Sequence, residues 1–142
     1  MATTNAATTY LENKLLSLIF KNNAGSFSTL GDSIYVGLAT AVSNAEAGTV
    51  TEATFGAYTR QQVTAANWTL ASASTDAQTC VNSGNIEWAA STGTDNTVTH
   101  IFLADAASSG NILFVGQLDN PRTIQTGDIF RINSSNLSFE LK

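Results

Sequence analysis

The residues best able to do chemistry in this chain are a single histidine and a single cysteine. His100 stands inside the apolar segment VTHIFLAD, where a hydrogen-bonded core or interface histidine is more common than a catalyst. A Ser-His-Asp triad would have to use His100, yet no serine stands in a G-x-S-x-G motif. Cys80 has no basic neighbour to stabilise a thiolate, so we expect a buried, inert thiol without an internal disulfide. We therefore predict that the protein is not an enzyme.

Metal and cofactor motifs are equally sparse. One cysteine and one histidine do not make a zinc site. Five aspartates fall at expected turns, where Asp bonds the backbone, and a calcium site there stays open although no D-x-D-x-D spacing supports it. They are Asp76, Asp95, Asp105, Asp119 and Asp128. There is no P-loop and no G-x-G-x-x-G, so we predict no cofactor.

Two tryptophans are the remaining candidates for ligand binding. Trp68 or Trp88 could stack on a sugar if it lay exposed on a groove, as in a carbohydrate-binding module. The alternative is that both belong to the core, which is the more common place for a tryptophan in a β-rich domain.

Charge limits the partners. The net charge is −5, and the six Lys and Arg residues are scattered, so we predict no direct nucleic-acid binding. Charged residues make up 12% of the chain, against about 25% in an average protein. The surface must then be rich in uncharged polar residues, which suits packing against other subunits but is also found on β domains with a Ser/Thr-rich surface. No apolar run approaches the roughly 20 residues of a membrane span.

The elements that must position these residues are mostly short strands. From residue 85 onward, β-branched and aromatic runs alternate with turn signals, and earlier strands are expected at 34–40 and 58–65 with an extension at 67–71. The later runs are NIEWAA, VTHIFLAD, NILFVGQL, DIFRIN and LSFELK. VTHIFLAD and NILFVGQL form a predicted hairpin with apolar residues on both faces. Its first strand is expected to place Val98, Phe102 and Ala104 on one face and Ile101 and Leu103 on the other.

A turn is expected at 119–121, around the chain's one proline. The predicted fold is mainly β, an antiparallel, jelly-roll-like β-sandwich with one N-terminal α-helix.

The helix is predicted over about residues 10–22. Thr9 and Glu12 have capping-box spacing, with Thr9 as the N-cap. Leu11, Leu15 and Leu18 lie on one apolar stripe that packs either on the protein's own sheet or on a neighbouring subunit. Residues 1–9 are expected to form a flexible arm, and residues 10–142 one domain.

Irregular segments are the expected places of partner contact. Residues 1–9, 43–57 and 72–84 have no clear periodicity, and loops adapt to a partner surface more easily than a packed sandwich does.

Several segments in order resemble a family of small virion proteins of tailed bacteriophages, labelled tail-fibre or structural proteins, with related members that decorate capsids. The resemblance covers residues 10–141. Its most specific parts are Y-x-R-Q-x-V at 58–63, V-T-H-x-x-L-x-D-A at 98–106, G-N-I-L-F at 110–114 and P-R-T-I-Q-T-G-D-x-F-R-I at 121–132. It implies a β-sandwich that is assembled in the host cytoplasm, sits in the virion, and binds other virion proteins without enzymatic residues.

Within a virion, two functions compete. One compact domain lacks the long shaft of a fibre, which favours a capsid cement or decoration protein that bridges major capsid protein subunits as a homotrimer. The alternative is a tail, tail-fibre or baseplate component, and a carbohydrate-binding module unrelated to phages is a further one.

Overall fold

The computed structural model describes residues 5–21, 34–72 and 78–141. Antiparallel strands dominate, and α1 is the one α-helix in these ranges. The elements in chain order are β1 (Ala6–Ala7), α1 (Thr9–Lys21), β2 (Ile34–Asn44), β3 (Thr49–Glu52), β4 (Gln61–Val63), the 3₁₀ helix η3 (Ala65–Asn67), β5 (Trp68–Ser72), β6 (Gln78–Asn82), β7 (Ile86–Glu87), β8 (Asn96–Ala104), β9 (Ile112–Ile124), β10 (Arg131–Ile132) and β11 (Ser138–Leu141).

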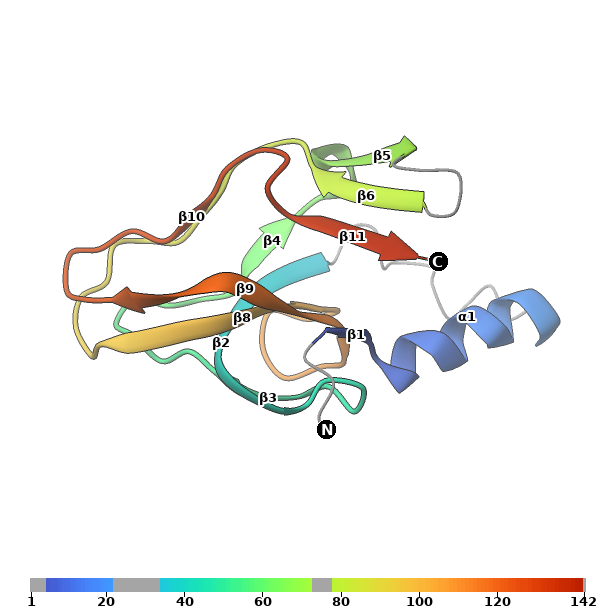
Figure 1. Ribbon diagram of the computed structural model, residues 1–142, viewed down its shortest axis with the longest axis horizontal. Helices are drawn as coiled ribbons and strands as arrows, with labels where there is room; N and C mark the ends of the chain where they lie inside the picture. The colour runs from blue at the N-terminus through green and yellow to red at the C-terminus, as the bar shows by residue number, and fades with distance from the viewer. Residues whose placement is uncertain (1–4, 22–33, 73–77, 142) are drawn as a thin grey trace.

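The strands form a curled sandwich. The largest sheet has the order β1-β9-β8-β2-β3, with β4 also paired to β2. A three-stranded sheet, β11-β6-β5, and the pair β10-β7 lie over one face of it (Figure 1). Buried side chains from both layers, among them Leu38, Trp88 and Leu137, form the main core. The prediction of an antiparallel β-sandwich with an N-terminal helix is confirmed.

The predicted β8–β9 hairpin is also confirmed, and β8 is buried on both faces. Ile101 and Leu103 face the main core, while Phe102 and Ala104 join a second cluster with residues of the β2–β3 hairpin. Val98 was expected beside Phe102 but lies in the main core. The ladder shifts register between Val98 and His100, and such a shift changes which face the next residues occupy.

The turn expected at 119–121 is wrong. β9 runs on to Ile124, and residues 118–121 stand opposite Thr99 alone, as a bulge. Proline has no N–H to give to the ladder, so Pro121 is tolerated where pairing is interrupted. Residues typical of turns therefore mark a bulge within one strand.

The N-terminal segment differs from the expected flexible arm. Ala6 and Ala7 pair with Val115 and Phe114 as β1, and the Asn5 side chain accepts the Gln117 N–H at 2.6 Å. Residues 1–4 lie outside the described residues. From Asn5 onward, the segment completes the sheet.

The helix begins one residue earlier than expected. Thr8, 1% exposed, accepts the Leu11 N–H at 3.4 Å and donates its hydroxyl to the Ile112 carbonyl at 2.6 Å. Thr8 is therefore the N-cap, and the capping box expected from Thr9 and Glu12 does not form. A buried threonine that also binds β9 is the better cap because the same hydroxyl ties the helix to the sheet.

Only the start of the helix is buried. Leu11 is in the core and Leu15 and Leu18 are half-buried. Three other apolar side chains of the helix are exposed, namely Leu16, Ile19 and Phe20. Figure 1 shows α1 extending away from the sheets.

Two segments expected to be irregular contain strands. The segment 43–57 includes β3, which forms a hairpin with β2 through a turn at Gly48, whose φ is +67°. The segment 72–84 includes β6, the central strand of the three-stranded sheet. Conversely, the strand expected at 58–65 is only β4 (Gln61–Val63), and the strand expected at 85–90 is only β7.

Candidate functional site

The single histidine is part of the packing. His100 is 8% exposed, and its Nδ1 lies 2.8 Å from Thr99 Oγ1. Burial lowers its pKa below the usual 6.5. Its Nε2 is buried without a hydrogen-bond partner among the described residues. A neutral imidazole enclosed by β-sheet residues gives a substrate no access.

The cysteine and the tryptophans are likewise structural. Burial raises the pKa of the half-buried Cys80 thiol, which disfavours the reactive thiolate. Trp88 is 1% exposed, so it cannot stack on a sugar. Trp68 donates its indole N–H to the Val63 carbonyl at 3.3 Å and packs edge-on against Phe139.

Of the four candidate aspartates that the structure describes, Asp105 and Asp128 hold turns, whereas Asp119 lies within β9. Asp105 accepts the backbone and side-chain N–H groups of Asn111 at 2.7 and 2.8 Å, and Asp128 accepts the Gln125 N–H at 2.9 Å. Asp76 lies outside the described residues. Within the described ranges, no group of three His, Cys, Asp or Glu residues is placed to hold a metal ion.

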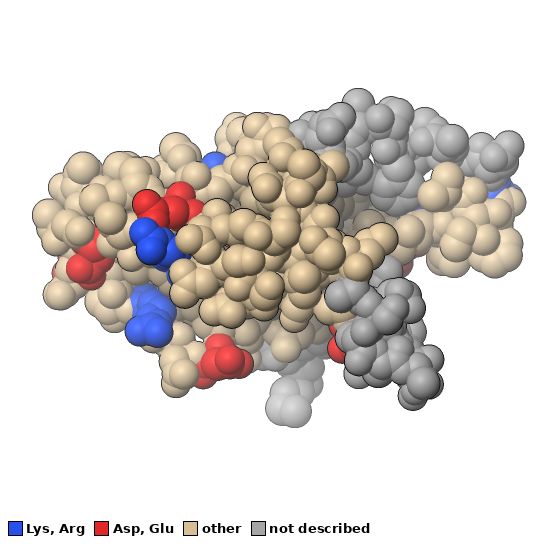
Figure 2. Space-filling view, turned by 90° about the horizontal axis from the view of Figure 1, so that it is seen from above, with Lys and Arg blue, Asp and Glu red and all other residues tan. Residues whose placement is uncertain are grey.

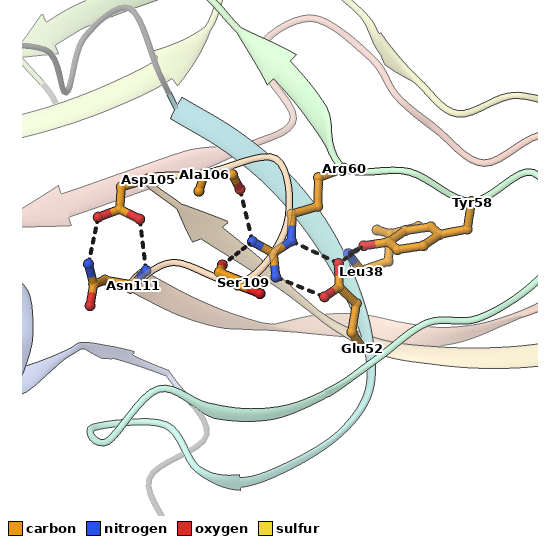
Figure 3. Close-up of polar contacts among 8 residues, drawn as sticks. All are labelled: Leu38, Glu52, Tyr58, Arg60, Asp105, Ala106, Ser109 and Asn111. Atoms are coloured by element: carbon orange, nitrogen blue, oxygen red, sulfur yellow. Dashed lines mark hydrogen bonds and ion pairs between the residues drawn. The ribbon is translucent and has the colours of Figure 1, made fainter.

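The densest polar cluster joins Glu52, Tyr58 and Arg60 (Figure 3). The Arg60 guanidinium donates to both Glu52 carboxylate oxygens at 2.8 Å. It also donates to the carbonyls of Ala106 and Ser109, in the β8–β9 loop, at 2.9 and 2.8 Å. Arg60 therefore ties β3, the segment before β4 and the β8–β9 loop together. We call Glu52, Tyr58 and Arg60 the Arg60 clip.

Tyr58 extends the clip to the backbone of β2. Its hydroxyl donates to Glu52 at 2.8 Å and accepts the Leu38 N–H at 3.0 Å. Leu38 lies between the stretches of β2 that pair with β4 and with β3, so the phenol fills a gap in the ladder.

The Arg60–Glu52 ion pair in the clip is largely removed from water on its Arg60 side. The Arg60 side chain is 6% exposed, and its guanidinium lies over the Phe102 ring, 5.0 Å from the centroid. Burial alone would raise the pKa of Glu52, but hydrogen bonds from Arg60 and Tyr58 and the Arg60 charge lower it overall. Burial and the Glu52 carboxylate raise the pKa of Tyr58 well above its usual value. The charges are neutralised internally, so the clip stabilises the fold and offers no acid or base to a substrate.

Sequence reasoning recognised part of this cluster. The Y-x-R-Q-x-V motif stood out at 58–63, but Glu52 was placed in a loop. The alternating T-V-T-E at 49–52 was the signal that could have identified β3 and its terminal carboxylate.

The surface carries few charges. Figure 2 shows most of the visible Lys, Arg, Asp and Glu side chains in the left half of this face, with a little blue at the right end, and most of the described surface in this view is uncharged. No helix in the described part of the chain is long and apolar enough to cross a membrane.

Comparison with known proteins finds one family. The sequence model for "Podophage GP4 fiber I protein gp80" matches residues 6–140, which span the main sheet, the three-stranded sheet and the Arg60 clip. Among curated proteins, none matches the chain.

Proposed function

The chain belongs to the family of the podophage GP4 fiber I protein gp80, a family of tailed-phage virion structural proteins, and we propose that it is a non-enzymatic component of a podophage tail fibre. The observation that carries this proposal is the extent of the match. Since the match covers residues 6–140, the β-sandwich itself is the unit that the family shares. A fibre component acts by holding its shape and binding neighbours.

The chemistry of the described side chains supports a structural function. The groups best able to act as acids, bases or nucleophiles are used within the fold: Glu52 and Arg60 bind each other, His100 is buried, and the Cys80 thiol is disfavoured as a thiolate. Catalytic sites normally present perturbed groups in an accessible cleft.

The uncharged surface supports binding to other protein subunits. Desolvating hydroxyl and amide groups costs less than desolvating charges, so such a surface can be buried in an assembly. We include self-association in the proposal, with a homotrimer as the expected state.

The family description favours the tail over the head. The sequence alone favours a capsid cement protein bound to the major capsid protein, because one compact domain has no shaft. A fibre can, however, include compact domains at its base or tip, and the description of the family names a fibre protein.

Immunogold labelling of intact virions, viewed by negative-stain electron microscopy, tests the proposal. Antibodies against this protein should label the tail region, and tails separated from heads should retain the protein. Labelling spread over the whole head, together with recovery of the protein only in tail-free heads, would overturn the fibre assignment and favour a capsid cement protein.

A further inference from the structure

An open groove of about 580 Å³ runs between β9 and β11, beside β1. Figure 1 shows β11 lying near the place where β1 joins β9. Three segments far apart in the sequence meet there. The groove, called the β9–β11 groove below, is lined by residues 5–7, 101, 114–119 and 136–140.

The floor of the β9–β11 groove is apolar and aromatic. The Phe114 and Phe139 rings lie 5.1 Å apart at 42°, both half-buried, and Ile101 lies opposite Gly116 on the neighbouring strand β8. Aromatic faces partly open to solvent can stack against the C–H face of a ligand.

The rim of the groove is polar and uncharged except for two carboxylates. Asn5 and Asn136, both exposed, bring carboxamides to the groove, although the Asn5 oxygen already accepts the Gln117 N–H. A carboxamide both donates and accepts, so it can match a hydroxyl group in either direction. Asp119 and Glu140 add acceptors.

The groove is unsuited to an anion. Among the described residues that line it there is no Lys, Arg or His, whereas two of them are acidic. A phosphate or carboxylate ligand would meet like charge there, so the matching ligand is neutral and rich in hydroxyl groups.

An extended peptide cannot add to the sheet along β9, because that edge is already occupied; within the described residues only β11, the end strand of its sheet, has an open edge at the groove. β1 occupies the edge of β9 at Phe114 and Val115, and Asn5 accepts the next N–H, that of Gln117. Beyond this point the bulge at 118–121 ends in Pro121, which has no N–H to offer. Bulges and prolines at an edge discourage a further strand.

We propose that the β9–β11 groove is a binding site for a neutral saccharide. The sugar ring stacks on the Phe114–Phe139 floor while the rim carboxamides bind its hydroxyl groups. Saccharide binding at this groove does not depend on where the protein sits in the virion. The binding test and the immunogold labelling test can therefore fail separately.

Gly116 offers a direct test. A Cβ built there meets only Ile101 Cγ1, at 3.8 Å, so Gly116→Leu should fold and extend a side chain into the groove. Gly84 is the matched control, because it lines a second groove of about 300 Å³ that has carboxamides but no aromatic residue. Its added Cβ would meet only Asn67 Oδ1, at 3.7 Å.

The purified full-length protein is screened on an array of neutral and acidic oligosaccharides, and hits are measured by calorimetry. We expect a neutral oligosaccharide to bind, Gly116→Leu to raise its Kd roughly tenfold or more, and Gly84→Leu to leave it unchanged. Thermal unfolding checks that both variants are folded.

Three results would overturn the proposal: no neutral saccharide binds, only acidic ones bind, or Gly84→Leu weakens binding while Gly116→Leu does not. Capture of extended peptides by the wild type, lost in Gly116→Leu and without saccharide binding, would assign the groove to a protein partner instead.

Discussion

Two arginine–glutamate pairs show that burial decides the importance of a residue contact. In the Arg60–Glu52 pair the side chains are 6% and 32% exposed, whereas in the Arg131–Glu87 pair they are 50% and 43% exposed. An exposed pair is screened by water and contributes little, whereas removing a buried guanidinium leaves the carboxylate and carbonyls that it bound without a donor.

Replacing Arg60 should therefore be costly. Arg60→Ala should lower the free energy of unfolding by about 2–4 kcal/mol, somewhat below the value for a fully buried pair because Glu52 keeps access to water. The control Arg131→Ala should change it by less than about 1 kcal/mol. Urea denaturation measures both, and equal effects would show that the clip is no stronger than a surface pair.

His100 should make stability depend on pH. Burial lowers its pKa in the folded state, so the unfolded chain binds the proton more tightly. Its stabilising contribution is complete above pH 6.5 and is lost as pH falls, by at most about 1.4 kcal/mol per pH unit. Glu52, whose folded pKa is also lowered, loses its contribution only below its usual 4.5.

The measurement compares urea midpoints at pH 7.5 and 5.5. The wild type should be less stable at pH 5.5, and His100→Phe should reduce that difference because the group that titrates in this window is removed. An unchanged difference would mean that His100 is protonated in the folded state.

Among the elements, the start of the helix gives the adjacent residues Thr8 and Thr9 different roles. Thr8→Ala removes the cap and the bond to the Ile112 carbonyl, and should cost about 1–3 kcal/mol. Thr9→Ala should change stability by less than about 0.5 kcal/mol because Thr9 is exposed. Thermal unfolding of the two variants measures which threonine contributes more to stability. A larger loss in Thr9→Ala would restore the capping box predicted from sequence.

The elements were predictable from sequence where a residue pattern had a single structural meaning. The β8–β9 hairpin followed from periodicity because its apolar residues are buried as the pattern requires, whereas the helix shows the predicted period although only Leu11 of its apolar stripe is buried. Pro121 was misassigned since turns and bulges favour the same residues. The strand β3 was missed because it is four residues long and half-exposed, which leaves little apolar pattern to detect.

The candidate sites were less predictable than the elements. In the Arg60 clip, Arg60 binds the carbonyls of Ala106 and Ser109, 46 and 49 positions further along the chain, and the β9–β11 groove joins residues 5–7 to residues 136–140. Nothing in the local sequence specifies such long-range neighbours. Residue types indicated what Arg60 could bind, but only the fold supplied its partner.

For the whole molecule, the low surface charge has a consequence for assembly. If the protein self-associates as proposed, its interfaces should be stabilised by apolar and uncharged polar contacts, which salt hardly screens. Light scattering should then give a mass about three times the 14.9 kDa of one chain, at both 50 mM and 500 mM salt. A 14.9 kDa species at every concentration would restrict association to the assembled virion.

The protection that the Tyr58 hydroxyl gives to β2 should be measurable by amide hydrogen exchange. The Leu38 N–H is protected by the Tyr58 hydroxyl, whereas the Ala53 N–H is protected by the Leu38 carbonyl at 2.8 Å. In Tyr58→Phe, the Leu38 amide should exchange roughly tenfold faster or more, relative to the Ala53 amide. One side-chain oxygen thus takes the place of a strand residue, and the local opening rate of the central sheet depends on a residue outside that sheet.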